Sequence, residues 1–478
     1  MIQYLTSILR ILEADFVMPN LNKLIRGTYV RMKNKPIEYW LYLFLLGILF
    51  LSYIIIGFFA TRIFENGDAV RKVNFGFSQL EAWRFRNFIL FTLVFLLILI
   101  FLRKLKTLVG IFFNWLEGKS LRIELFITLF AFVMIAIFLV FSTTFLNIDG
   151  RELQRKFERD IPTFGFHATH DEMWELYFHS RFWFYTHKYF GWDVRFSYRV
   201  ASSIMGGIFV YVLLKYTRQR FGRNWFAFAL LICSGGYMQL FFGDIENYTM
   251  TAVLIFLYLW SSDEYIQGKT SLIIPSLVLA IALTFHLLSG FFLPSLAYLY
   301  FLAIQRKQYL HVGLGFILSS LIIGLTLLFF ANHGLPLRNL WTASHASGGG
   351  GNYSDSLALP SFGYYSQIIN LLFLLVPAFI FLLPLFLFNR IKLTATNIHL
   401  LISTVGALIL TFGWKAQLGV YKDWNLFAVT ALPISLLVWS NFEKIDDVNL
   451  KSETALLAGF VFFTHSVTWI ISNYWFKR

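Results

Sequence analysis

The stretch Val312-Gly-Leu-Gly-Phe-Ile-Leu-Ser-Ser-Leu-Ile-Ile-Gly-Leu-Thr-Leu-Leu-Phe-Phe-Ala331 contains no charged side chain. A bilayer needs a helix of about 20 predominantly apolar residues to cross its hydrocarbon core, and this stretch has that length. Similar apolar stretches follow one another along most of the chain. They predict an all-α, polytopic membrane protein.

The composition of the 478 residues supports the same class of protein. Hydrophobic residues make up 58% of the chain and the mean hydropathy is +0.64, whereas charged residues make up only 14%, against about 25% in soluble domains. Aromatic residues reach 19%, which suits lipid-facing helices with Trp and Tyr at the membrane interfaces. The net charge of +14 is better explained by cytoplasmic loops and contacts with anionic membrane lipids than by nucleic acid.

Hydropathy along the chain predicts about thirteen spans of bilayer length. The stretch from Leu272 to Leu302 has two interpretations, either two spans joined at His286–Gly290 or one long kinked passage. We expect an N-terminal cytoplasmic segment with two extra spans in residues 1–122, a main transmembrane module in 123–440, and a last span in 441–478. The predicted spans cover residues 38–60, 87–102, 123–146, 200–216, 225–242, 249–260, 271–286, 288–304, 312–331, 367–388, 397–413, 426–440 and 455–472.

Basic residues predict the orientation of the chain in the membrane. Arg103-Lys104 follows the second predicted span and Arg306-Lys307 the eighth, on the side shared with the basic N-terminus. Because cytoplasmic loops carry an excess of Lys and Arg, that side is predicted to be cytoplasmic. We therefore expect the unusual polar residues of the other side to form an extracytoplasmic site in the inner (plasma) membrane of a bacterium. They lie around Asp171, in Gly243–Thr249, at His286 and in Trp414–Asn425.

Asp171 and Glu172 are the polar residues most informative about function. They stand in the run His167-Ala-Thr-His-Asp-Glu-Met-Trp-Glu175, within a long polar loop between two predicted spans. Carboxylates near a bilayer surface are costly to desolvate, so their presence among aromatic residues suggests chemistry on a membrane-borne substrate. Residues 171–192 predict a helix that lies in the interface. A plainer interpretation is that both acids only stabilise the first turn of this helix through its dipole.

A multi-span chain whose first large external loop carries Asp-Glu just ahead of an aromatic juxtamembrane helix resembles the GT-C glycosyltransferases. This group contains the protein O-mannosyltransferases and the lipid A aminoarabinose transferases. The resemblance covers roughly residues 123–440 and implies a GT-C-like fold with juxtamembrane helices in the first large extracytoplasmic loop. It implies that Asp171-Glu172 holds the catalytic base, that Asp244 or Glu246 forms a second acidic site, and that His286 stands at the external end of its helix.

Glycosyl transfer outside the cytoplasm has no nucleotide sugar available, so the natural donor is a sugar on a polyprenyl phosphate. The transfer needs a carboxylate that takes the proton of the acceptor hydroxyl and cations that stabilise the departing phosphate, for which Arg is preferred because of its fork of donors. We predict an inverting transfer to a lipid, glycan or protein acceptor, with Asp171 as base and Glu172 as its catalytic partner. Candidate substrate-binding residues are His170, Asp244, Glu246, Asn247, His286, Lys422 and Asp423, and candidate phosphate-binding residues are Arg181, Arg195, Arg199 and Lys415.

Two further interpretations remain open. His167, Asp171, Glu175 and His179 recur every fourth residue, so that they share one helical face and could hold a divalent metal, although no established metal-binding signature is matched. The protein could instead be a transporter or flippase of lipid-linked saccharides. Such proteins favour charges near mid-membrane and broken helices in paired repeats, whereas this sequence shows no clear internal repeat and its acids cluster at one surface.

Overall fold

The computed structural model describes residues 36–65, 93, 112, 115–116, 119–143, 148–243, 245, 247–335, 361–414, 420 and 423–475. All regular secondary structure in these ranges is helical, and η denotes a 3₁₀ helix. In chain order the helices are α3 (Ile37–Glu65), α6 (Ser120–Val140), α7 (Ile148–Phe164), α8 (Met173–Phe190), α9 (Val194–Phe221), η3 (Gly222–Asn224), α10 (Trp225–Cys233), η4 (Gly236–Phe241), α11 (Thr249–Ile266), α12 (Ile273–Phe285), η5 (Leu287–Phe292), α13 (Leu293–Gln305), α14 (Tyr309–Asn332), α16 (Phe362–Leu375), η6 (Pro377–Phe381), α17 (Leu382–Leu387), α18 (Ala395–Gly413), η7 (Trp424–Thr430), α19 (Ala431–Phe442) and α20 (Val448–Trp475).

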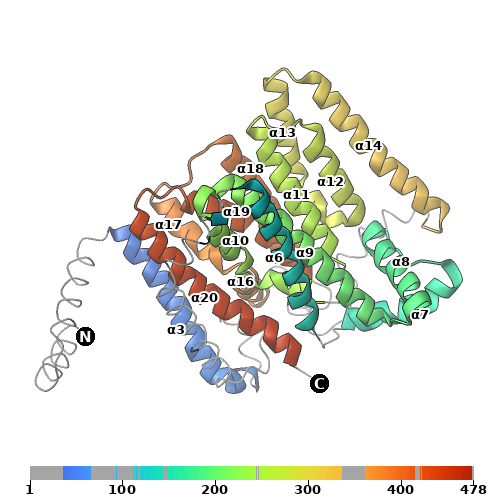
Figure 1. Ribbon diagram of the computed structural model, residues 1–478, viewed down its shortest axis with the longest axis horizontal. Helices are drawn as coiled ribbons and strands as arrows, with labels where there is room; N and C mark the ends of the chain where they lie inside the picture. Colours follow the sequence, from blue (N-terminus) through green and yellow to red (C-terminus); the bar gives the residue numbers. More distant parts are fainter. Residues whose placement is uncertain are drawn as a thin grey trace, which may run out of the picture.

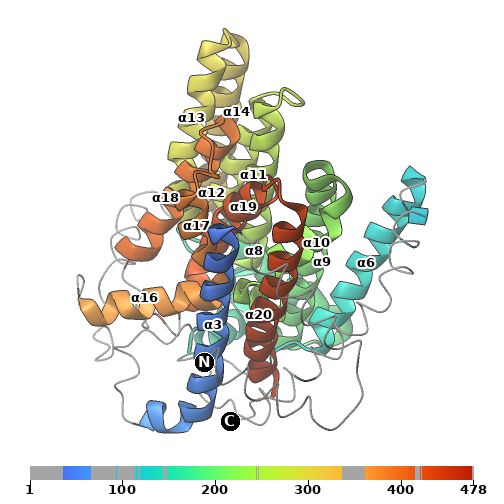
Figure 2. The same ribbon diagram turned by 90° about the vertical axis from the view of Figure 1, so that its left-hand side faces the viewer.

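The long helices pack into one bundle, and α7 and α8 lie together at its edge, near the end of α14 (Figure 1). Helix α16 crosses the direction of α3 and α20 (Figure 2). Polar residues define where several of these helices begin. Asp193 starts α9 by accepting a hydrogen bond from Phe196 N at 2.6 Å, and Thr394 starts α18 by accepting one from Asn397 N at 3.3 Å.

Seven helical segments of the described residues are long and apolar enough to cross a membrane, or eight if one bent pair is counted as a span. This confirms the prediction of an all-α polytopic membrane protein. The prediction of about thirteen spans stays a prediction, because the range 87–102 lies outside the described residues except for Leu93. The seven segments are Ser120–Val140, Val194–Cys233, Leu287–Gln305, Tyr309–Asn332, Ala395–Gly413, Trp424–Phe442 and Leu450–Ile471.

The stretch from Leu272 to Leu302 forms two helical segments rather than one kinked passage. Helix α12 ends at Phe285, and His286 is extended, with φ of −150° and ψ of 129°. The chain then continues through η5 into α13, and Leu287–Gln305 is long enough to span a membrane. His286 therefore occupies the connection between the apolar helix α12 and the candidate membrane span Leu287–Gln305.

Two breaks within helices pack against each other. Helix α10 ends at Cys233 and is followed by η4. Helix α16 ends at Leu375 and is followed by η6, and the chain bends by 100° between them. A Cβ atom at Gly235 would lie 2.3 Å from the carbonyl oxygen of Leu375, so only glycine allows the two backbones to come this close. The predicted span over 367–388 contains this bend, because Pro377 disfavours helical geometry at Val376.

Ion pairs join helices at the end of the bundle farthest from α8. Lys215 Nζ donates to both carboxylate oxygens of Glu124 at 2.7 and 2.9 Å, which ties α9 to α6. Arg390 forms a bidentate pair with Glu38, at 3.1 and 2.6 Å, which ties α3 to the chain just after α17. Because α9 is about 40 Å long, its ion-paired end is remote from its start beside α8.

Helix α18 contacts η5 at Gly406, where a Cβ atom would lie 2.1 Å from the carbonyl oxygen of Phe291. We expect Gly406→Ala to push α18 and η5 apart and to lower the free energy of unfolding by about 1–3 kcal/mol, as overpacking does. Gly313→Ala is the matched control, because Gly313 is also helical but has open space around its Cα. Thermal unfolding in detergent measures both variants, and equal midpoints would contradict the expectation.

Candidate functional site

The helix predicted over residues 171–192 is present as α8, but the acid pair in front of it does not cap it. Glu172 occupies the N-cap position and makes no capping hydrogen bond. Its carboxylate instead accepts a hydrogen bond from Asn247 Nδ2 at 3.0 Å, and its other oxygen lies 3.4 Å from His286 Nε2. A capping hydrogen bond therefore does not explain the position of Glu172.

Asp171 is held through its main chain rather than through its side chain. Its carbonyl oxygen accepts a hydrogen bond from Leu287 N at 2.9 Å, so the loop before α8 is joined to the start of η5. The side chain is partly exposed, and among the described residues it has no hydrogen-bond or ion-pair partner. The structure thus presents a carboxylate whose backbone is fixed and whose oxygens are available to a substrate.

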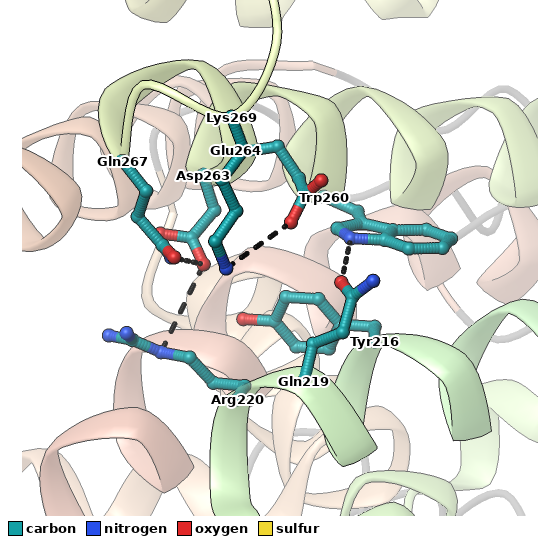
Figure 3. A pocket seen from close by; sticks show the side chains of 8 residues that line it. All are labelled: Tyr216, Gln219, Arg220, Trp260, Asp263, Glu264, Gln267 and Lys269. Carbon is teal, nitrogen blue, oxygen red and sulfur yellow. Dashed lines mark hydrogen bonds and ion pairs between the residues drawn. The ribbon is translucent and has the colours of Figure 1, made fainter. Parts of the chain in front are cut away.

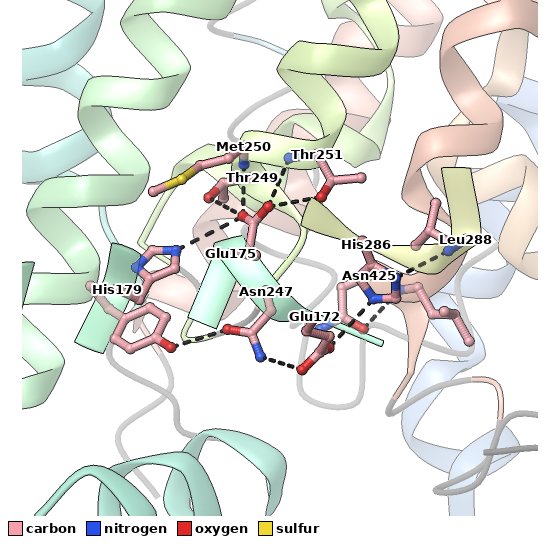
Figure 4. Close-up of polar contacts among 12 residues, drawn as sticks. Glu172, Glu175, His179, Asn247, Thr249, Met250, Thr251, His286, Leu288 and Asn425 are labelled. Atoms are coloured by element: carbon pink, nitrogen blue, oxygen red, sulfur yellow. Dashed lines mark hydrogen bonds and ion pairs between the residues drawn. The ribbon is translucent and has the colours of Figure 1, made fainter. Parts of the chain in front are cut away.

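Three segments that are distant in sequence meet around Glu172 (Figure 4). Tyr198 of α9 donates its hydroxyl to Asn247 Oδ1 at 3.1 Å, which leaves the amide nitrogen of Asn247 to face Glu172. His286 accepts a hydrogen bond from Leu288 N at Nδ1, at 3.2 Å, so its Nε2 is the nitrogen that carries the proton. The ring of Tyr248 stacks on that of His286 with centroids 5.0 Å apart. Each neighbour of Glu172 is therefore oriented by a further contact.

Glu175, in the first turn of α8, is fully buried and binds the N-terminus of α11. Its carboxylate accepts hydrogen bonds from Met250 N at 2.8 Å, Thr251 N at 2.9 Å and Thr251 Oγ1 at 2.8 Å. The first backbone N–H groups of a helix have no partner within the helix, and its dipole favours a negative charge there. Burial raises the pKa of Glu175, and the hydrogen bonds from α11 oppose part of this rise. Glu175 thereby fixes α8 against α11, beside Asn247.

The four-residue repeat in and before α8 does not assemble a metal site. Within the described ranges, no group of three His, Cys, Asp or Glu side chains is placed to hold a metal ion. His179 is 1% exposed, stacks on Tyr198 with ring centroids 4.1 Å apart, and has no hydrogen-bond partner among the described residues. Its Nε2 lies 3.9 Å from Glu175 Oε1. Glu175 and His179 are thus interior residues that attach α8 to the bundle.

Burial lowers the pKa of His179 to about 3, from 6.5. Below pH 6.5 the unfolded chain binds a proton that the folded protein does not, so stability present above this pH is lost as the pH falls towards 3. Between pH 7 and pH 5 this loss is about 2 kcal/mol. We expect His179→Phe, which keeps the stacking on Tyr198, to have a smaller decrease in thermal midpoint between these pH values than the wild type. His187→Phe, at an exposed position of α8, is the control, and an equal decrease in all three proteins would contradict the expectation.

The predicted phosphate-binding arginines lie at two places. Arg181 donates to the Gly165 carbonyl at 2.9 Å and to Tyr185 Oη at 2.6 Å. Its guanidinium is therefore already hydrogen-bonded near the start of the loop that precedes α8. Arg199 donates to Ser142 Oγ, and Gly243 lies against its side chain. Arg195 lies close enough to Arg199 for the two positive charges to interact. Arg199 and Arg195, rather than Arg181, therefore flank the link that leads to Asn247.

The structure describes only some of the other predicted site residues. Asp244, Glu246, Lys415 and Lys422 lie outside the described residues, so their roles stay predictions. Asn247 nevertheless brings the end of the acidic link into contact with Glu172. His170 is partly buried directly before Asp171, and Asp423 is buried directly before η7. Thus the structure brings Glu172, Asn247 and His286 together, beside Asp171.

Sequence reasoning missed two neutral residues of the site, Tyr198 and Asn425. Tyr198 contacts Asn247, and Asn425 lies at the start of η7 with 3% of its surface exposed. A tyrosine at the beginning of a span suggests an interfacial anchor, and a single asparagine carries no charge that would draw notice. The only available signal was that Asn425 belongs to the run Asp423-Trp-Asn-Leu-Phe427.

A second polar cluster lies near the ion-paired end of the bundle, and its side chains pair with one another (Figure 3). Asp263 accepts hydrogen bonds from Gln267 Nε2 at 2.8 Å and from Thr396 Oγ1 at 3.0 Å, and it lies 4.0 Å from Arg220 Nε. These contacts connect α11 to α18 and α9. We therefore regard the cluster as structural, in contrast to Asp171.

Comparisons of the chain with protein-family models, curated proteins and solved structures give no match. The GT-C resemblance of the acid pair and its surrounding loops therefore remains a prediction from the residues. What the chain can do must be argued from its own geometry, above all from the difference between Asp171 and Glu172.

Proposed function

We propose that this chain is an integral membrane glycosyltransferase of the GT-C type, which moves a sugar from a polyprenyl-phosphate donor to a lipid, glycan or protein acceptor on the extracytoplasmic side. The supporting observation is the contrast between two adjacent acids. Asp171 has a fixed backbone and a carboxylate without a partner among the described residues, whereas Glu172 is engaged by Asn247 beside His286. One free and one oriented carboxylate suit a base and its supporting group.

In this proposal the acceptor hydroxyl attacks the anomeric carbon of the donor sugar from the face opposite the phosphate. A bond forms between the acceptor oxygen and that carbon, while the bond from the carbon to the phosphate oxygen breaks. The proton of the hydroxyl moves to Asp171, and the electron pair of the broken bond leaves with the polyprenyl phosphate. Arg199, whose side chain lies against Gly243, and Arg195 beside it would stabilise the phosphate charge.

The experiment that tests this proposal is a transfer assay with purified protein in lipid vesicles. Mass spectrometry of lipids that copurify with the protein selects the donor. Labelled polyprenyl-phosphate hexoses and pentoses are then supplied, with the copurified lipids and an extract of cell-envelope glycans and proteins as acceptors. We expect protein-dependent release of polyprenyl phosphate together with a labelled product. If no donor in this panel loses its sugar in the presence of folded protein, the enzyme proposal is overturned.

One observation favours a second candidate function, a transporter or flippase of lipid-linked saccharides. The break between α10 and η4 packs against the break between α16 and η6, and transporters bind their substrates at discontinuous helices. A flipping assay in the same vesicles separates the two functions. A transporter moves a fluorescent lipid-linked sugar between leaflets with its sugar attached, whereas the proposed enzyme releases the polyprenyl phosphate.

A further inference from the structure

The side chains of Asn425 and His286 are hydrogen-bonded in the same way. Asn425 Oδ1 accepts a hydrogen bond from Leu426 N at 2.9 Å, and His286 Nδ1 accepts one from Leu288 N at 3.2 Å. In both side chains the acceptor atom is therefore satisfied by a nearby backbone N–H group. The atom that remains, Asn425 Nδ2 or His286 Nε2, is a donor.

Neither of these donors has a hydrogen-bond acceptor among the described residues, although both side chains are buried. Asn425 is 3% exposed and His286 is 6% exposed. The Glu172 oxygen nearest to His286 Nε2 is 3.4 Å away, longer than the separation of about 2.7–3.2 Å that is typical of such bonds. Buried donors are nearly always paired in native proteins, so these two donors at one site call for oxygen acceptors, supplied by water or by a bound group.

The two donors belong to the same end of the site. His286 directly precedes η5 and Asn425 is the second residue of η7, and both of these 3₁₀ helices pack against α18. Figure 4 shows the side chain of Asn425 at the His286 end of the cluster around Glu172. The helix that follows each donor leads into the bundle, so both are carried by rigid elements and not by loop tips.

The charge of Glu172 determines which oxygen-bearing group fits. A phosphate offers only acceptors and would be repelled by the nearby carboxylate, whereas a sugar hydroxyl can accept from both N–H groups and donate its own proton to Glu172. We propose that Asn425 Nδ2 and His286 Nε2 bind a hydroxyl oxygen of the substrate sugar, with Glu172 as the acceptor for that hydroxyl. This inference rests on the proposed function and assigns Asn425 a role in selecting the sugar.

Binding to lipids with and without a sugar tests the assignment. Undecaprenyl phosphate lacks the sugar, whereas undecaprenyl-phosphate glucose, mannose and galactose carry it with different hydroxyl orientations. Affinities are measured in the Asp171→Asn background, which is not expected to turn over the donor, so that failure of hydroxyl binding is distinguishable from failure of transfer. We expect Asn425→Ala to weaken binding of at least one sugar-bearing lipid by about 5- to 100-fold and to leave undecaprenyl phosphate unaffected.

Asn425→Ser controls for folding, because its side chain stays small and uncharged, and its hydroxyl oxygen can accept from Leu426 N in place of Asn425 Oδ1. We expect it to lose sugar-dependent binding as strongly as Asn425→Ala while keeping the thermal midpoint of the wild type. Equal weakening for lipids with and without the sugar would assign the donors to phosphate and overturn the inference. Unchanged affinity of both variants for all three sugar-bearing lipids would overturn it as well.

Discussion

Replacing Asp171 by asparagine is expected to abolish sugar transfer while the protein stays folded and still binds its donor. Asparagine has nearly the same shape but cannot take up the proton of the acceptor hydroxyl, and loss of a positioned base lowers kcat by about 100- to 10,000-fold. The fold should tolerate the change, because the Asp171 carboxylate has no partner among the described residues and its main chain is held by Leu287 N. Initial rates of polyprenyl phosphate release measure the effect, with thermal unfolding as the test of folding.

Asp446→Asn is the matched control, because Asp446 is exposed near Arg390, at the ion-paired end of the bundle. It removes the same charge from the chain, and we expect it to leave the rate unchanged. The role of Asp171 as base is wrong if its asparagine variant turns over at the rate of the wild type. A general effect of charge, in which both variants lose activity equally, would argue against it too.

Replacing Glu175 by alanine is expected to cause the largest loss of stability of any substitution considered. The change leaves Met250 N and Thr251 N buried at the start of α11 without the carboxylate that accepts their hydrogen bonds. Removing one partner of such a buried, charged network typically costs about 3–5 kcal/mol, a large share of the 5–15 kcal/mol that stabilises a typical domain. We expect little folded protein in detergent, as measured by size-exclusion chromatography and thermal unfolding.

Glu152→Ala controls for the loss of a glutamate from the same part of the chain. Glu152 lies on α7 and pairs with Lys156 at 3.0 Å, but the pair is exposed, so its removal should cost less than about 1 kcal/mol. Thr251→Val removes only one hydroxyl bond to Glu175 and gives a milder variant if Glu175→Ala does not accumulate. Equal stability of the Glu175 and Glu152 variants would show that Glu175 does not anchor α8 on α11.

Features that depend on local sequence or on the order of the spans were predictable, whereas the bends of the backbone and the partners of buried side chains were not. The apolar stretch of α14 predicts its own span, because bilayer thickness fixes the length of a crossing helix. The approach of Asn247 and His286 to Glu172 follows from placing their connections on one side of the membrane. The partner of Glu175 was not predictable, since a carboxylate that binds backbone N–H groups leaves no pattern in the partner's sequence. Hydropathy likewise could not show the bend after α16, because it records composition and not dihedral angles.

The packing of α3 against α20 has a consequence for biosynthesis. Tyr53 of α3 stacks on His465 of α20 with ring centroids 4.5 Å apart, although about 400 residues separate the two helices in the chain. At roughly 5–20 residues per second, a ribosome needs about 20–80 s to make the intervening chain. During this time the face of α3 that will contact α20 is exposed to lipid or to other proteins of the membrane. Insertion of the last described helix therefore completes the bundle, and a chaperone or translocon that shields α3 until then would increase the yield of folded protein.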